Sequence, residues 1–226
     1  MEDIELTETN LDNAFILEQE GSKRLVTKNL VPGINVYGEK LLRVQNDEYR
    51  FWDPYRSKLA AILLKGSSIS LKKDSTVLYL GAANGTTASH VSDIVSLGVV
   101  FAIEFSPRAM HDLIRVSIPR LNMIPILADA MHPNSYKNMV SQVDFLYQDI
   151  AQREQARIVI RNAELFLKKD GMLVLMIKSR SIDSVKKTSE VANNEVNKLE
   201  GIFKILELIN LEPYHFDHVA VIAQKI

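Results

Sequence analysis

The strongest constraint on the fold is a series of continuous apolar stretches, which begins at residue 76 and alternates with segments of helical length. The stretches are TVLYLG, VVFAIEF, IPILADA, VDFLYQDI and GMLVLMIKS. Strands that are apolar on both faces are typical of a parallel sheet covered by helices on both sides. We expect these helices over Thr87–Leu97, after Ser106-Pro107, over Gln152–Leu167 and over Asp183 to about Glu200.

The two remaining parts of the sequence depart from this pattern. FKILELINL and HVAVIAQKI are separated only by EPYHFD, which is too short for a crossover helix, so the last two strands should be antiparallel. Between Asn13 and Asp53, short alternating stretches broken by glycine and proline turns predict a small antiparallel β unit. We therefore divide the α/β chain into an antiparallel β N-terminal domain, 1–52, and a mostly parallel domain, 53–226. Asp53 and Pro54 resemble the N-cap and first residue of a helix that ends near Gly66.

Composition excludes several kinds of site. The sequence has no cysteine, which excludes disulfides, thiolate metal sites and thiol nucleophiles. Its 27 Lys and Arg nearly balance its 28 Asp and Glu, so we do not expect it to capture nucleic acid by net charge alone. No apolar run approaches the roughly 20 residues of a membrane helix, and the scattered His and Asp have no metal-site spacing. We expect a cytoplasmic protein without a membrane segment or a metal.

A turn of small residues, GAANGT, follows the first apolar strand. The dinucleotide pattern G-x-G-x-x-G would need glycines at 81, 83 and 86, and only the first is present. The register G-x-G-x-G fits better, with Gly81 and Gly85 in place and Ala83 leaving room for a ligand beside the backbone. This register favours a nucleoside-binding methyltransferase over a dehydrogenase, because S-adenosylmethionine has no pyrophosphate.

Carboxylates end the next two strands. Glu104 in FAIEFS is placed to accept hydrogen bonds from both ribose hydroxyls of a nucleoside, and Asp129 in ILADA to accept one from an adenine amino group. Each acid taken alone is equally well explained as a solvated strand end. Gln152 either lines the same pocket or begins a helix, and His90 is interpreted as a packing or capping residue.

The segments YLGAANGTTASHVSD, FAIEFSPRAM, ILADAMHPNSY, VDFLYQDIAQREQ and RSKLAAIL resemble the fibrillarin family in its archaeal form, over essentially the whole chain. Asn84 stands where many members have serine. The resemblance implies a class I methyltransferase fold, with a Rossmann-like sheet, that transfers methyl groups from S-adenosylmethionine to ribose 2′-hydroxyls of rRNA and tRNA. Eukaryotic members carry a Gly/Arg-rich N-terminal tail, which the given sequence lacks, in keeping with the expected cytoplasmic location.

The resemblance also implies partners and a set of cofactor contacts. The partners are a box C/D guide RNA that selects the target, a Nop-family scaffold protein and a ribosomal-protein-like subunit that binds the kink-turn of the guide RNA. Delivery of the substrate by such partners would explain the near-neutral charge. The expected cofactor-binding residues are Gly81, Ala82, Ala83, Gly85, Thr86, Thr87, Glu104, Phe105, Asp129, Ala130, Asp149 and Gln152.

The family's catalytic Lys-Asp-Lys-His tetrad maps to Lys58, Asp149, Lys178 and His218. The expected topology agrees, because two parallel strands end at Asp149 and Lys178 and the antiparallel last strand begins at His218, at the same sheet edge. We assign Lys178 the role of base or hydroxyl-orienting group, positioned by Asp149, with Lys58 and His218 completing the network. An ordinary lysine is protonated at neutral pH, so the base role requires a lowered pKa.

Plainer interpretations compete with this one. Lys58 is also compatible with a surface lysine, His218 with a strand-edge histidine, and Asp149 with Lys178 as a structural ion pair. Alternative functions are methylation of protein glutamine or of a small molecule, and a non-catalytic structural subunit of a ribonucleoprotein. The apolar side chains of Phe51, Trp52 and Tyr55 would serve docking in the last case, although core packing also explains them.

Overall fold

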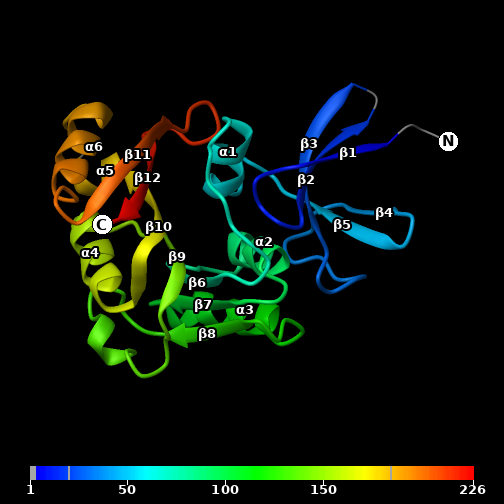
Figure 1. Ribbon diagram of the computed structural model, residues 1–226, viewed down its shortest axis with the longest axis horizontal. Coiled ribbons are helices and arrows are strands. Elements are labelled where there is room, and N and C mark those ends of the chain that lie inside the picture. Colours follow the sequence, from blue (N-terminus) through cyan, green and yellow to red (C-terminus); the bar gives the residue numbers. More distant parts are fainter. Residues whose placement is uncertain (1–3, 20, 184) are drawn as a thin grey trace.

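The computed structural model describes residues 4–19, 21–183 and 185–226, and two sheets dominate it (Figure 1). The smaller sheet is antiparallel, with the order β1-β2-β3-β5-β4. Its strands are β1 (Glu5–Glu8), β2 (Ala14–Gln19), β3 (Ser22–Lys28), β4 (Leu41–Val44) and β5 (Asp47–Phe51). The predicted antiparallel N-terminal unit is therefore confirmed for the described residues, which leave out 1–3 and Glu20. The division into two domains at residue 52 stays a prediction.

The larger sheet has the order β11-β12-β10-β9-β6-β7-β8. Its strands are β6 (Thr76–Leu80), β7 (Val99–Glu104), β8 (Met123–Leu127), β9 (Val143–Gln148), β10 (Leu167–Lys178), β11 (Phe203–Asn210) and β12 (His218–Lys225). Neighbouring strands from β8 to β10 are parallel, whereas β12 runs antiparallel to both β10 and β11. The expected mostly parallel sheet with an antiparallel last strand is confirmed.

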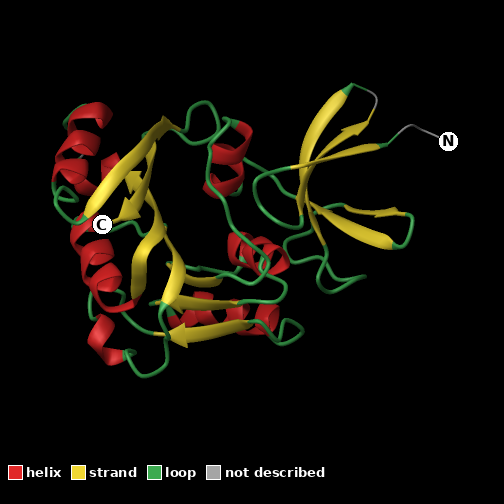
Figure 2. Cartoon of the chain, in the orientation of Figure 1, coloured by secondary structure: helices red, strands yellow, loops and turns green. Residues whose placement is uncertain are grey.

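Helices cover both faces of the larger sheet (Figure 2). They are α1 (Lys58–Leu64), α2 (Thr86–Ile94), α3 (Pro107–Ser117), α4 (Gln155–Phe166), α5 (Ser179–Ile182) and α6 (Thr188–Asn197), with a short 3-10 helix, η1 (Pro133–Ser135). The helices α1, α2 and α3 pack in one apolar cluster, which continues into the small sheet through Leu25 and Trp52. The helices α4 and α6 pack in a second cluster on the opposite face. None of the described helices is both long and apolar enough to cross a bilayer.

Two predicted helix boundaries were wrong near the N-terminal junction and in the loop after β9. The helix α1 begins at Lys58 rather than Pro54, because Ser57 caps it and accepts a hydrogen bond from the amide of Ala60 at 3.3 Å. Asp53 instead holds a turn, in which its carboxylate accepts from the amide of Tyr55. The helix α4 begins at Gln155, three residues later than expected.

The single helix expected from Asp183 to Glu200 is also wrong. The chain forms α5, which ends at Ile182, and then α6 from Thr188. Between them the carboxylate of Asp183 accepts from the amides of Val185 and Lys186, at 2.8 and 3.1 Å. This side-chain turn competes with helical hydrogen bonding and breaks the helix. Ser184 lies outside the described residues.

A buried cluster of charged side chains joins the small sheet to the larger domain. Arg50 on β5 is fully buried and pairs with Glu39 at 2.6 Å and with Asp93 on α2 at 2.7 Å. Asp93 also accepts from Arg120 at 2.6 Å, so each carboxylate is compensated. Although burial alone would raise it, Arg50 and backbone amides hold the pKa of Glu39 below its ordinary value.

His90 on α2 completes this joint between the two sheets. The hydroxyl of Thr27 on β3 donates to Asp93 at 2.9 Å, so Nδ1 of His90 donates to Thr27 at 2.8 Å. Nε2 of His90 lies 2.8 Å from the hydroxyl of Tyr37, which donates to the carbonyl of Phe51 at 3.0 Å. The ring stacks on Trp52 with centroids 4.8 Å apart. Burial, together with nearby arginine charges, lowers the pKa of His90 well below its ordinary value. The joint fixes α2, which starts at the end of the glycine-containing turn.

Candidate active site

The turn after β6 contains two glycines, one that allows two strand ends to approach and one that begins a helix. Gly81 has a φ of +84°, and a Cβ there would lie 2.4 Å from the carbonyl oxygen of Asp149, so the ends of β6 and β9 approach closely only with glycine. Gly85 has a φ of +87° and caps α2, and a Cβ there would meet Leu113 and Val116 on α3. Gly85, one of the expected cofactor residues, therefore faces a packed helix at its Cα.

A pocket of about 240 Å³ opens at the carboxyl ends of four parallel strands, β9, β6, β7 and β8. Its walls include most of the expected cofactor residues, namely Gly81, Ala83, Glu104, Phe105, Asp129, Ala130, Asp149 and Gln152. Four further residues line the pocket that were not predicted from the sequence: Ile103, Ala128, Ile150 and Ala151. All four adjoin a predicted residue, so extending each strand end by one or two positions would have included them.

Four expected cofactor residues do not line this pocket: Ala82, Gly85, Thr86 and Thr87. Ala82 is buried in the core behind the turn. The hydroxyl of Thr87 on α2 donates at 3.0 Å to that of Ser57, the residue that caps α1. Thr87 therefore helps to fix the helix that carries Lys58 rather than facing a ligand in this pocket.

Backbone amides hold the two strand-end carboxylates in place. The carboxylate of Glu104 accepts from the amides of Ala83 at 2.8 Å and Ser106 at 2.7 Å. That of Asp129 accepts from the amide of Met131 at 2.9 Å and contacts Nδ1 of His132 at 3.1 Å. A carboxylate has about four lone-pair sites, so each group is oriented and retains capacity for a ligand's hydroxyl or amino hydrogens.

The lining of this pocket fits a nucleoside that carries a positive charge and no phosphate. It contains the carboxylates of Glu104, Asp129 and Asp149 but no lysine or arginine. A pyrophosphate would meet uncompensated negative charge there, whereas a sulfonium nucleoside such as S-adenosylmethionine would be attracted. The apolar side chains of Phe105 and Ile150 offer surfaces for a base. Among the described residues, no group of three or more His, Asp or Glu is arranged to hold a metal.

At the mouth of the pocket, Asp149 forms an ion pair with Lys58. The Nζ atom of Lys58 lies 2.9 and 2.7 Å from the two carboxylate oxygens of Asp149, just beyond the end of β9. The side chains are 18% and 26% exposed, so water still reaches them. Asp149 therefore belongs both to the pocket and to a polar cluster outside it. The expected pairing of Asp149 with Lys178 does not appear, because Lys58 occupies the carboxylate.

Lys178 and His218 lie side by side on neighbouring strands. They are opposite one another in the register of β10 and β12, so their side chains project from the same face of the sheet. Among the described residues, no hydrogen bond or ion pair engages the Lys178 amine, while its backbone bonds to Gln155. Its amine is therefore available to a substrate.

The tautomer of His218 follows from its hydrogen bond to the backbone of Phe216. The carbonyl of Phe216 lies 2.6 Å from Nδ1, so this nitrogen donates and Nε2 is left as an acceptor. Partial burial is the main cause that lowers the pKa of His218 below its ordinary value, and the charge of Lys58 acts in the same direction. That influence of Lys58 and Asp149 shows that His218 lies in their electrostatic neighbourhood. The tetrad therefore gathers at one end of the sheet.

His215 is a residue of this region that sequence reasoning missed. Its Nε2 donates to the carbonyl of Pro54 at 2.8 Å, and its ring centroid lies 6.0 Å from that of His218. Beside it, the rings of Tyr214 and Tyr55 meet edge to face at 5.2 Å. The loop before β12 is thus attached to the segment that leads into α1. Two histidines three positions apart in HFDH were the available signal.

The chain is similar to known proteins over nearly its whole length. The Fibrillarin family model matches residues 6–226. A fibrillarin-like rRNA/tRNA 2′-O-methyltransferase of Methanosarcina barkeri is 57% identical over 206 residues, which cover 89% of this chain and 91% of that protein. Aeropyrum pernix fibrillarin, solved with natively bound S-adenosyl-L-methionine, has a TM-score of 0.88 and 45% identity, covering 99% of this chain and 100% of that one.

A second similar structure is that of fibrillarin in a fibrillarin/Nop5p complex. It has a TM-score of 0.88 and 44% identity, and the match covers 95% of this chain and 98% of that one. The family match, the high identity to a curated relative and the two structural matches all extend over nearly the full length of the chain. The chain belongs to the fibrillarin family.

Proposed function

We propose that this protein is an S-adenosylmethionine-dependent 2′-O-methyltransferase that acts on riboses of rRNA and tRNA. The observation that carries the proposal is the double position of Asp149, which lines the phosphate-free nucleoside pocket and also holds Lys58. A methyl donor in the pocket and a hydroxyl at the polar cluster would meet at this residue. The 2′-O-methyltransferase name of the Methanosarcina barkeri relative and the S-adenosyl-L-methionine in the Aeropyrum pernix structure support it.

The pocket residues are proposed to hold the cofactor. Glu104 would accept from the ribose hydroxyls and Asp129 from the adenine amino group, while Phe105 and Ile150 pack against the base. When bound, the cofactor supplies an electrophilic methyl group on a positively charged sulfur. The three carboxylates around the pocket, with Asp149 as the third, suit that charge.

The polar cluster is proposed to orient the ribose hydroxyl and to receive its proton. The Lys58–Asp149 pair fixes the position of the hydroxyl, and the free amine of Lys178 donates to its oxygen. Nε2 of His218 is an unprotonated acceptor at neutral pH, because the pKa of this ring lies below its ordinary value. We therefore favour the orienting role for Lys178 and assign proton uptake to His218.

We further propose that the protein is the catalytic subunit of a box C/D guide ribonucleoprotein. The solved fibrillarin/Nop5p complex supports a Nop-family scaffold as partner. The guide RNA and the kink-turn-binding subunit are proposed because the near-neutral chain, with a net charge of −1, lacks the overall charge to hold RNA by itself.

Reconstitution tests both proposals. With guide RNA, scaffold and kink-turn protein, the wild type should methylate the one ribose that the guide selects, and the free chain should bind S-adenosylmethionine in preference to NAD in calorimetry. Asp149→Asn and Lys178→Ala should each lose turnover by about 100-fold or more. Cofactor affinity should stay within a few-fold in Lys178→Ala, which lies outside the pocket lining, and should fall in Asp149→Asn, which removes one of the three pocket carboxylates. Lys169→Ala, at an exposed position of β10, is the matched control and should behave as wild type.

Each other outcome has a defined meaning. Wild-type rates in both variants would contradict the assigned site. Methylation of a protein glutamine or of a small molecule, without methylation of RNA, would favour the alternative substrates. Cofactor binding without turnover on any of them would favour a structural subunit.

A further inference from the structure

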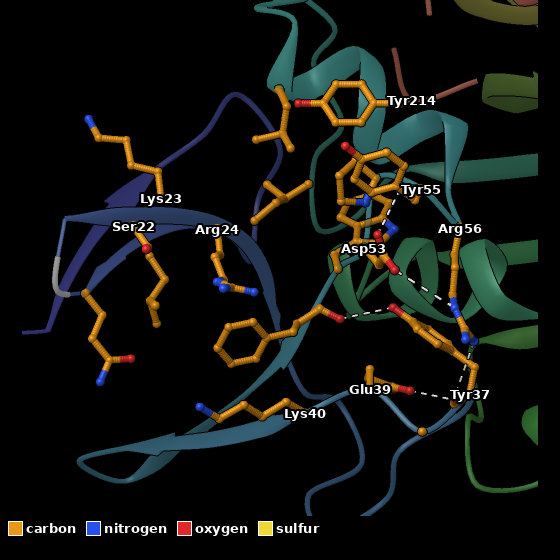
Figure 3. Close-up of a pocket in the computed structure, with 18 residues that line it drawn as sticks. Ser22, Lys23, Arg24, Tyr37, Glu39, Lys40, Asp53, Tyr55, Arg56 and Tyr214 are labelled. Atoms are coloured by element: carbon orange, nitrogen blue, oxygen red, sulfur yellow. Dashed lines mark hydrogen bonds and ion pairs between the residues drawn. The ribbon is translucent and has the colours of Figure 1, made fainter. Parts of the chain in front are cut away.

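A second hollow lies between the small sheet and the segment that leads into α1. It has a volume of about 1190 Å³ and is open to solvent. Figure 3 shows Arg24 directed into its middle, Lys40 along one side, and Tyr55 with Tyr214 at the end nearest α1. We call it the basic groove, defined by Arg24, Lys40, Arg56, Tyr37, Tyr55 and Tyr214.

Cations outweigh acids on the surface of the basic groove. Among the described residues, no hydrogen bond or ion pair engages the guanidinium of Arg24, and Lys40 lies over the ring of Phe51 at 5.2 Å without an acidic partner. Glu39, the nearest carboxylate in sequence, is turned inward, where its 2% exposed side chain pairs with Arg50. Its negative charge is therefore already neutralised and cannot compensate the two free cations.

The basic groove leads to the active site. Tyr55 is 64% exposed and lies three residues before Lys58, while Tyr214 is next to His215, which bonds to the carbonyl of Pro54. The edge-to-face contact of the two tyrosines therefore sits where the groove meets the segments that carry Lys58 and His218. A chain that lies in the groove would continue toward the tetrad.

We propose that the basic groove binds the sugar-phosphate backbone of the RNA strand that carries the target ribose. This inference rests on the proposed function. Arg24 and Lys40 contact phosphates beside the target nucleotide, and the exposed face of Tyr55 packs against a neighbouring ribose or base. Phosphate contacts of this kind set the register of a nucleic acid without reading its sequence, which suits an enzyme whose target is chosen by a guide.

The unpaired positive charges of the groove, rather than its residue types, favour RNA over a protein partner. Lysine is depleted in protein–protein interfaces, whereas arginine and tyrosine are enriched there. Here two cations without acidic partners stand in an open, polar hollow. Binding a polyphosphate would release counterions from the RNA, a gain that a neutral protein surface does not provide.

The test uses the complete reconstituted particle with Arg24→Gln/Lys40→Gln. The variant should raise the KM for target RNA roughly tenfold at physiological salt and leave kcat within about twofold. It should also lower the slope of log affinity against log salt by about 2, close to one per lost phosphate contact. The double change Arg24→Lys/Lys40→Arg keeps both charges and should restore the slope. Arg43→Gln, on the exposed side of β4 and outside the groove, is the matched control.

The outcomes separate this inference from the proposed function. A wild-type particle that methylates no RNA would contradict the function itself. A wild-type particle that works, with unchanged KM and salt slope in the double variant, would overturn the groove inference alone. Loss of binding to the scaffold protein with an unchanged salt slope would also overturn it, since the groove would then dock protein. Thermal unfolding of each variant checks that the fold is intact.

Discussion

Two clusters of the molecule pair a basic side chain with aspartate, and they differ in how far water reaches them. In the joint between the sheets, Arg50 and Asp93 are 0% exposed, and Glu39 and Arg120 compensate them. At the proposed active site, Lys58 and Asp149 are 18% and 26% exposed. There the neighbours Lys178 and His218 keep an amine and a ring nitrogen that no described residue engages.

The difference in solvent exposure determines whether each cluster can stabilise the fold or bind a substrate. A charge fully out of water must keep its partners, because leaving one uncompensated costs several kcal/mol. The joint is therefore suited to holding α2 and the turn in place, and unsuited to exchanging protons. The cluster at the proposed active site is anchored by one pair and retains donors and acceptors that no described residue engages, so it is suited to exchanging water for a substrate hydroxyl.

The largest expected effect comes from breaking the joint. Arg50→Met leaves the buried carboxylates of Glu39 and Asp93 short of a partner, so the free energy of unfolding should fall by about 3–5 kcal/mol in urea denaturation. Arg43→Met on the exposed face of β4 is the control and should change it by less than about 0.5 kcal/mol. A loss below 1 kcal/mol for Arg50→Met would mean that the joint is not a stabilising contact.

The next largest effect is expected in the Lys58–Asp149 pair, where activity should change more than stability. Lys58→Met frees the carboxylate of Asp149, which water can still solvate, so the unfolding free energy should change by about 1 kcal/mol or less. Turnover in the reconstituted particle should fall on the order of 100-fold, equivalent to about 2.7 kcal/mol. Equal and large losses of stability and activity would show that Lys58 is mainly structural.

The smallest effect is a pH dependence of stability that arises in the joint. The pKa of His90 is lowered in the folded chain, so below about pH 6.5 the unfolded chain binds a proton that the folded chain does not. The stability is complete above that pH and should fall by up to about 1.4 kcal/mol per pH unit as acid is added, toward the folded pKa.

A comparison of histidine variants isolates this effect. In His90→Gln, the free energy of unfolding should decrease less steeply as the pH is lowered below about 6.5. His215 and His218, whose pKa values are also lowered, should leave a residual slope. His111→Gln at an exposed position of α3 should retain the full slope. An unchanged slope in His90→Gln would refute a neutral buried ring.

The sequence predicted elements whose signal lies within a few neighbouring residues. Apolar runs identified the seven strands of the larger sheet, and polar residues at the ends of those runs identified Glu104 and Asp129, which the pocket contains. Helix starts were less accurate: Ser106-Pro107 was confirmed, whereas Asp53-Pro54 was not. Both dipeptides could cap a helix and place proline at its first position. For α1, however, the folded chain uses Ser57 as the cap instead of Asp53.

What the sequence determined by itself was the order of strands and helices and the family, because periodicity and motifs are local properties of the chain. The tertiary structure alone decided that Asp149 pairs with Lys58, 91 positions away, rather than with Lys178. It also revealed the joint at Arg50 and Asp93. Such pairings depend on which side chains the packing brings within hydrogen-bonding distance, and residues distant in sequence carry no local sign of that proximity.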